Sequence, residues 1–416
     1  MRKHHVGTSS EIRKWTHPGM TPPRWLGRKF RLFIVGLVVL IASPASPAAS
    51  TAEIMHDVFD ALAYLLPLSA RESNYDTQWD AELIDSKLKV LAGASSAMAA
   101  HSPPGDEHFS LLARAFDKSV QDITVSFQHE WPEYAYYSLL ELTEHCANCH
   151  RRLQAQSRNE FGQKLLARMH SDDLAPGARL SVLLATREFD HALTLLEGQL
   201  MDPAIGPVEA TYRGYLRTYL RVALSTGSAV ARIADFLRNY RARTDQPLYL
   251  RQQLDNWLGD LARHEQALGD EPTLAYARAS FNKASTSSLI PGHANGVIND
   301  LVAARMMREW LTKNADAPSA TRADIYYHLA VVALRTTGLE PTVPEMEMLL
   351  VACIEADPGG PYAVSAYHLL EEYGYVQEEH LAQQKDSQIL IDMSVLRQQV
   401  GLGTGNELRR SSALTD

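Results

Sequence analysis

Hydrophobic residues recur at helical spacing along most of the chain. From residue 52 to 66 the apolar positions fall on one face, and similar stripes run over about residues 76–100 and 107–130. A fourth helix is expected after Trp131-Pro132, because proline suits the first turn of a helix. The pattern therefore predicts four consecutive amphipathic helices, the first of them ended by Pro67.

Helical patterns separated by short polar breaks continue over residues 160–400, without strand-like alternation or a glycine-rich phosphate loop. Residues 185–197 look like the second helix of a tetratricopeptide repeat. A clearer unit comprises residues 326–333, 346–356 and 362–373, with Asp357-Pro358 closing a helical hairpin. These segments resemble the helix pairs of tetratricopeptide proteins. The sequence predicts an all-α fold: a four-helix bundle, then an α-solenoid of tetratricopeptide-like helix pairs, then a disordered tail over residues 401–416.

The first fifty residues have the pattern of an export signal. Basic residues precede an apolar run over residues 32–42, which is too short to span a bilayer comfortably, and small residues follow it. Residues 1–50 are therefore expected to be a signal peptide, cleaved near residues 48–50, that sends the protein to the periplasm. An uncleaved segment would instead anchor the protein in the membrane, facing the periplasm, and membrane contact is expected only in that case.

Charge narrows the choice of partners. The formal charge of the whole chain is -9, and residues 1–50 hold eight Lys or Arg against one acid, which leaves about -16 for the rest. Such an acidic surface argues against nucleic acid and against an anionic membrane as partners.

The chain has three cysteines, and two of them form the motif Cys146-Ala147-Asn148-Cys149-His150. This C-x-x-C-H pattern is typical of covalent haem attachment: two thiols can each form a thioether to a haem vinyl group, and the histidine is placed to bind the iron. The alternatives are a thioredoxin-like redox pair, half of a zinc site, or coincidence. Cys353, the third cysteine, lies on an apolar helix face and is expected to be buried and inert.

The motif lies on the apolar stripe of the fourth predicted helix. Steps of three and four residues join Leu139, Leu142, Cys146, Cys149 and Leu153. The thioether cysteines therefore share the face that packs into the bundle, and we expect one haem c between this helix and its neighbours.

Four helices with C-x-x-C-H late in the fourth resemble the class II c-type cytochromes, the cytochrome c-prime group of four-helix bundles, over about residues 51–158. The resemblance implies that Cys146 and Cys149 are the thioether donors and His150 the proximal iron ligand. It also implies a residue near the start of the first helix on the distal side of the haem, a methionine ligand in low-spin members and an apolar residue in high-spin members. Met55 is the candidate distal ligand, although a methionine on a helix stripe is also an ordinary core residue. Arg151 could pair with a haem propionate or simply complement the helix dipole.

These features favour a periplasmic monohaem c-type cytochrome that transfers one electron at a time, with residues 160–400 docking a redox partner protein. Two alternatives are a diatomic gas-binding or sensing haem protein, and a partner-recruiting scaffold with a structural haem. An enzyme is not expected, because no paired carboxylates or nucleophile with a base appear in the sequence. A homodimer would fit the resemblance, since two-fold dimers are common among such bundles.

Overall fold

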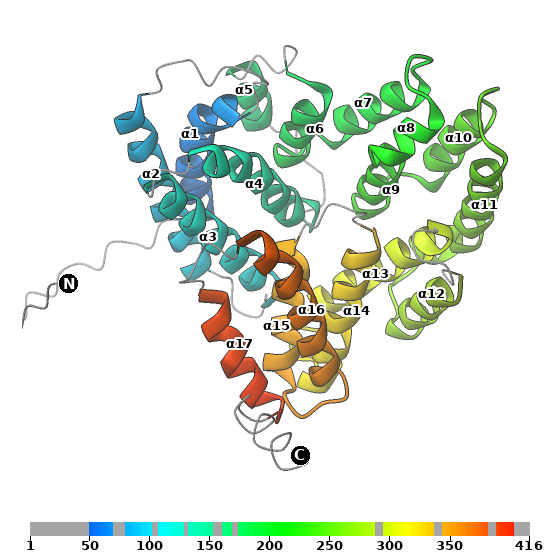
Figure 1. Ribbon diagram of the computed structural model, residues 1–416. Helices are drawn as coiled ribbons and strands as arrows, with labels where there is room; N and C mark the ends of the chain where they lie inside the picture. The colour runs from blue at the N-terminus through cyan, green and yellow to red at the C-terminus, as the bar shows by residue number, and fades with distance from the viewer. Residues whose placement is uncertain are drawn as a thin grey trace, which may run out of the picture. The chain divides into compact units, whose positions relative to one another are not determined.

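The computed structural model describes part of the chain, and residues 1–49 of the segment expected to be a signal peptide lie outside that part. The described ranges are residues 50–69, 80–101, 107–128, 132–152, 160–168, 174–287, 294–336, 343–381 and 388–402. Every regular element within these ranges is a helix (Figure 1), which confirms the predicted all-α class.

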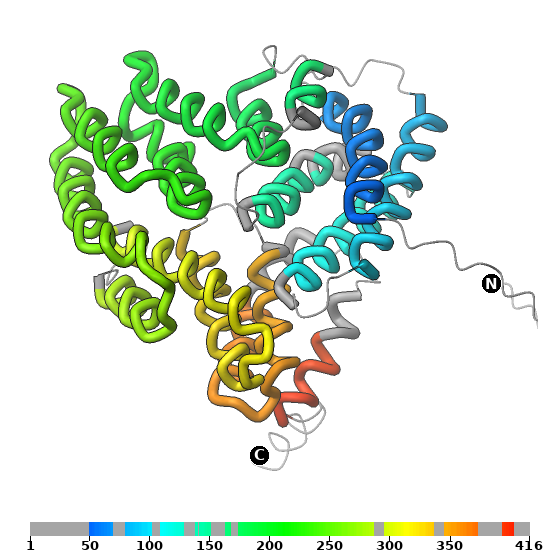
Figure 2. Tube along the Cα trace, turned by 180° about the vertical axis from the view of Figure 1, so that it is seen from behind, coloured from blue at the N-terminus to red at the C-terminus, as the bar shows by residue number. Residues whose placement is uncertain are grey.

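The first four helices pack as a closed set of neighbours. They are α1 (Thr51–Ser69), α2 (Ala81–Ala100), α3 (Glu107–Gln128) and α4 (Pro132–Arg152). Each packs against the next, and α4 also packs against α1. Figures 1 and 2 show these blue-to-teal helices side by side. Their shared core consists mainly of leucine, isoleucine, valine and phenylalanine side chains from all four helices.

Side-chain caps define two of the helix starts. At α1, Ser50 and Glu53 form a reciprocal capping box: the Ser50 amide donates to the Glu53 carboxylate at 2.7 Å, and the Glu53 amide donates to Ser50 Oγ at 3.3 Å. At α2, Asp80 Oδ1 accepts from the Leu83 amide at 3.0 Å. Because Asp80 is the N-cap, α2 begins later than the expected position near residue 76.

The prediction that Pro67 ends the first helix is wrong. The helix continues to Ser69, with Pro67 inside its last turn. Leu65 and Leu66 just before the proline are fully buried. We infer that this core packing outweighs the loss of one backbone hydrogen bond near the helix end, where few bonds remain to be lost.

Twelve helices follow α4 up to residue 381, and one more follows residue 387, within the described ranges. Their bounds are α5 (Glu160–Arg168), α6 (Pro176–Ala185), α7 (Phe189–Met201), α8 (Pro207–Tyr212), α9 (Tyr215–Ser225), α10 (Val230–Arg241), α11 (Leu248–Gly269), α12 (Leu274–Ser287), α13 (Val297–Lys313), α14 (Ser319–Thr336), α15 (Val343–Ala356), α16 (Ala363–Leu381) and α17 (Gln388–Gln399). A short 3₁₀ turn, Ala294–Gly296, precedes α13.

Most of these helices pack against near neighbours in sequence: α6 against α7, α10 against α11, α12 against α13, α14 against α15, and α15 against α16. Figure 2 shows the succession from green through yellow to orange. One prediction about these helices is wrong. Residues 185–197 are not a single helix, because α6 ends at Ala185 and α7 begins at Phe189. The tight turn between them places Arg187 at a positive φ of 63°.

Two hydrophobic cores meet at α4 and α6. Leu139 and Leu142 of α4 belong to the core of the first four helices, whereas Ala147, two turns later, belongs to the core of the following helices. On α6 the adjacent residues Val182 and Leu183 divide between the two cores in the same way. The second half of α4 therefore contacts both cores, through Ala147 on one side and Cys146 on the other.

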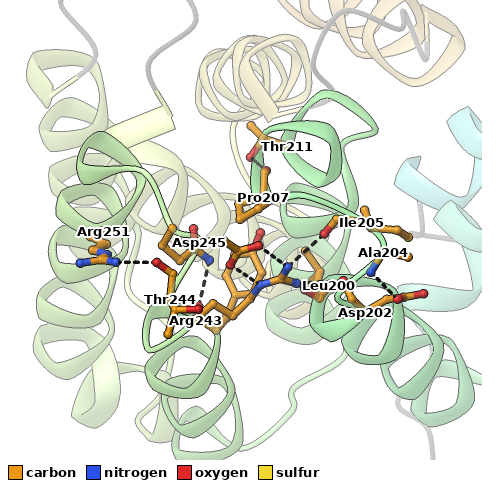
Figure 3. A network of polar contacts seen from close by, with 12 residues as sticks. Leu200, Asp202, Ala204, Ile205, Pro207, Thr211, Arg243, Thr244, Asp245 and Arg251 are labelled. Atoms are coloured by element: carbon orange, nitrogen blue, oxygen red, sulfur yellow. Dashed lines mark hydrogen bonds and ion pairs between the residues drawn. The ribbon is translucent and has the colours of Figure 1, made fainter.

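A buried arginine holds two loops together in the middle of the chain (Figure 3). Arg243 follows α10, and its side chain is only 8% exposed. Its guanidinium donates to the carbonyl oxygens of Leu200, Asp202 (3.2 Å) and Ile205 (3.1 Å), which lie at and after the end of α7. It also pairs with Asp245 at 2.7 Å. The planar five-donor guanidinium satisfies several carbonyls at once, which an ammonium group would not do.

We expect Arg243→Ala to lower the free energy of unfolding by about 3 kcal/mol, because it leaves buried carbonyls without donors. Arg243→Lys should recover less than half of the loss. Arg238→Ala is the matched control, since that side chain is 62% exposed and pairs with an exposed Asp235; its cost should stay below about 1 kcal/mol. Urea unfolding followed by circular dichroism measures all three. Equal losses for the alanine variants would contradict a clamping role for Arg243.

The end of the described chain is a capped helix. Gly401 has a φ of 76°, its amide donates to Gln398 at 3.1 Å, and the Leu402 amide donates to Arg397 at 3.1 Å. The remaining residues of the expected tail lie outside the described ranges. Among the helices that the structure describes, none is both long and apolar enough to cross a bilayer.

Candidate haem site

The motif Cys146-Ala147-Asn148-Cys149-His150 lies in the last two turns of α4. Cys146, Cys149 and His150 stand at positions i, i+3 and i+4, so they share one face of the helix. All three are half-buried. The helix thus brings together two thiols and an imidazole, the donor set that a covalently attached haem requires.

His150 is oriented by a backbone carbonyl from another helix. Its Nδ1 lies 2.7 Å from the carbonyl oxygen of Ala185, the last residue of α6. A carbonyl can only accept, so Nδ1 carries the hydrogen and Nε2 is left as the lone-pair nitrogen. This is the tautomer that binds a metal through Nε2, and iron-binding histidines are commonly fixed by such a second hydrogen bond.

The electrostatic surroundings also keep His150 neutral. Burial lowers the pKa of its imidazole to about 4; the Ala185 hydrogen bond opposes this shift, and the charge of Arg187 adds to it. A neutral imidazole is the form that can donate a lone pair to iron.

Cys146 packs against the core of the first four helices. It is half-buried as a residue, yet burial raises the pKa of its thiol to about 12, with Cys149 adding to the shift. We infer that the sulfur lies on the inward side of the residue. Cys353 on α15 is fully buried, and burial raises its thiol pKa to about 12 as well, which confirms the expectation of a buried cysteine there.

His145 immediately precedes Cys146 in α4 and is not one of the three candidate donors. Its Nε2 is 3.0 Å from Ser119 Oγ on α3, its ring lies beside Phe116, and only 6% of the residue is exposed. Burial lowers its pKa to about 4, partly opposed by the carboxylates of Glu144 and Glu345. This histidine therefore joins α4 to α3 in its neutral form.

Acidification should unfold the protein partly through His145. Its pKa is about 4 when folded and 6.5 ordinarily, so the unfolded chain takes up the proton first as the pH falls. The contribution of His145 to the free energy of unfolding is therefore complete above pH 6.5 and falls as the pH drops toward 4. The expected decrease in the free energy of unfolding is about 2 kcal/mol between pH 7 and 5. Urea unfolding at several pH values should show a shallower slope for His145→Gln. The control is His56→Gln, at an exposed histidine of α1, and it should keep the wild-type slope. Identical slopes for all three proteins would refute this role of His145.

A buried charge pair connects the helix of the motif to α9. Glu144 Oε2 lies 3.7 Å from an Nη2 of Arg221, and both side chains are largely buried. Among the described atoms, Glu144 Oε2 and Arg221 Nε make no hydrogen bond. The pair holds α9 against α4 two residues before Cys146, and it leaves hydrogen-bonding capacity uncommitted beside the motif.

The two remaining sequence candidates, Met55 and Arg151, lie on α1 and at the end of α4. Met55 lies in the first turns of α1, which packs against α4, and it is half-buried beside the core of α1–α4. Its neighbour Ile54 is only 3% exposed and takes the more interior position. Arg151 lies in the last turn of α4, and its side chain lies outside the described part of the structure.

Sequence reasoning missed Ala185 and Arg221 as neighbours of the motif. Ala185 acts through its backbone carbonyl, which no side-chain pattern reveals, and it lies 35 residues from His150. Arg221 is one of several arginines on α9 and α10, so the sequence alone does not distinguish it from the others.

Among the described residues, no group of three or more His, Cys, Asp and Glu side chains is arranged to hold a metal ion. Comparisons with known proteins give no further identification: no family model, no curated protein and no solved structure matches this chain.

Proposed function

We propose that this protein is a monohaem c-type cytochrome that transfers single electrons in the periplasm. The proposal rests on the donor set on α4. Cys146, Cys149 and His150 share one face of this helix. The hydrogen bond from Nδ1 of His150 to the Ala185 carbonyl leaves Nε2 as the nitrogen that would bind iron. A bound haem would supply a one-electron iron couple at this place.

The roles of the residues follow from their chemistry. Each thiol, Cys146 and Cys149, would add across a haem vinyl group, forming a carbon–sulfur bond while its proton passes to the vinyl carbon. His150 would hold the iron from the proximal side, and Met55 would be the distal ligand. Arg151 remains a candidate partner of a haem propionate. Methionine ligation at Met55 would raise the reduction potential and favour electron transfer over ligand chemistry.

The helix packing supports two further features of the proposed protein. The cyclic packing of α1–α4 supports a cytochrome c-prime-like four-helix bundle, and the pairwise packing of α13–α16 supports a solenoid of tetratricopeptide-like helix pairs. In this proposal the later helices dock a redox partner protein, and the chain is a carrier rather than an enzyme, exported by its first fifty residues.

A second candidate function is diatomic gas binding by five-coordinate iron. It is favoured by the deeper burial of Ile54 next to the half-buried Met55, since an apolar residue on the distal side would leave the sixth position open.

Redox titration of the full-length, haem-loaded protein tests the proposed function. We expect a reversible transition that follows a one-electron Nernst curve, with a reduced spectrum that is unchanged by carbon monoxide. An irreversible transition, or a spectrum shifted by carbon monoxide, would count against an electron carrier, and the shift would favour the gas-binding alternative.

A further inference from the structure

The C-terminal turn of α6 has a defined geometry. The Glu188 amide donates to the Leu183 carbonyl at 2.9 Å and the Arg187 amide donates to Leu184 at 3.3 Å, which are the two bonds of a Schellman motif. Thr186 adds a bond from its Oγ1 to Val182 at 2.8 Å. This turn is what fixes the direction of the last carbonyl of the helix.

Arg187 occupies the position in this motif that normally belongs to glycine. Its φ of 63° is left-handed, and it is the only non-glycine residue with a positive φ in the described part of the chain. A side chain in this conformation carries a backbone strain of about 1 kcal/mol. The surrounding packing must hold the turn in place, since Leu184, Ala185 and Thr186 are all buried.

The motif leaves the Ala185 carbonyl without a backbone donor, and His150 supplies one. Neither Schellman bond ends on Ala185, and its oxygen instead accepts from Nδ1 of His150 at 2.7 Å. Carbonyls at a helix C-terminus carry the negative end of the helix dipole, which strengthens such a bond. The contact therefore directs the imidazole and increases its electron density.

We propose that the turn over residues 185–188 is the positioning element of His150, so that a helix beyond the predicted bundle forms part of the haem site and sets the electronic character of its axial ligand. This inference rests on the proposed haem attachment. It also links α6, and the helices packed on it, to the haem site. A displacement of α6, such as one caused by a docked partner, would change the hydrogen bond to His150 and with it the ligand field of the iron.

The expected consequence is a change of midpoint potential. A histidine whose Nδ1–H is held by a strong acceptor is a more basic ligand, and a more basic ligand stabilises ferric iron. Weakening the bond to Ala185 should therefore raise the midpoint potential. The ferrous iron–imidazole stretching frequency, where a high-spin form can be prepared, should fall at the same time.

Two variants at one position separate geometry from charge. Arg187→Gly removes the guanidinium and favours the left-handed turn, whereas Arg187→Val removes the same charge but resists a positive φ. We expect the full-length, haem-loaded Val variant to have a higher midpoint potential than the Gly variant, and the Gly variant to be at least as stable as the wild type. If Arg187→Val does not fold, Arg187→Ala provides the same comparison with a smaller distortion.

Equal midpoint potentials and equal stretching frequencies in the Gly and the Val or Ala variants would overturn the positioning role. Haem staining on a denaturing gel distinguishes this failure from that of the proposed function. Stained variants with equal potentials refute the role of the turn alone, whereas a wild-type protein that takes no stain refutes haem attachment and the inference with it.

Discussion

Replacing Cys146 and Cys149 together with serine should abolish haem staining of the protein on a denaturing gel. Serine keeps the size of the side chain but cannot form the thioether, so any haem that remains would be held only by His150 and by packing, and denaturation would release it. Each single replacement should retain one thioether and leave a stained band, with an altered reduced spectrum from the unreacted vinyl group.

Cys353→Ser is the matched control for this experiment. That cysteine is fully buried on α15, outside the motif, and its replacement should leave staining at the wild-type level. Staining that survives the double replacement would show that these cysteines do not attach haem, and the roles assigned to α4 would then fail.

Met55→Ala should convert the iron from a low-spin form that does not bind carbon monoxide to a high-spin form that does. Removing a thioether ligand opens the sixth coordination position, and the loss of this ligand should also lower the midpoint potential, because methionine ligation favours ferrous iron. Absorption spectra of the reduced protein with and without carbon monoxide measure the change.

Met98→Ala provides the control for lost packing. Met98 lies on α2, is only 6% exposed and belongs to the same hydrophobic core, so its replacement should cost about 2–3 kcal/mol of stability without making the iron reactive to carbon monoxide. A wild-type protein that is already high-spin and binds the gas would exclude Met55 as a ligand and favour five-coordinate iron.

The starts of several helices could be predicted because the helix-start residues and the apolar stripe indicate the same position. The start of α4 follows from Pro132 and the apolar stripe after it, and α3 begins at Glu107 as the pattern indicated. The expected start of α2 near residue 76 is about four residues too early, and the cap geometry at Asp80 shows where the helix begins.

The turn between α6 and α7 could not be predicted for a different reason. A helix C-terminus is usually signalled by glycine, and here Arg187 takes the left-handed position instead. The two thiols and the imidazole could be placed on one helix face from the sequence, because Cys146, Cys149 and His150 stand at helical spacing. The hydrogen bond that orients His150 could not be predicted, because its acceptor is a main-chain oxygen that only tertiary packing brings close.

The intact mass of the full-length protein, produced in cells that attach haem to exported cytochromes, is the most direct test of haem attachment at Cys146 and Cys149. After denaturation the mass should exceed that of the polypeptide by one haem, and fragmentation should place the added mass on the peptide that contains Cys146 and Cys149. A mass equal to that of the polypeptide alone, from cells that load another c-type cytochrome normally, would show that this protein does not attach haem.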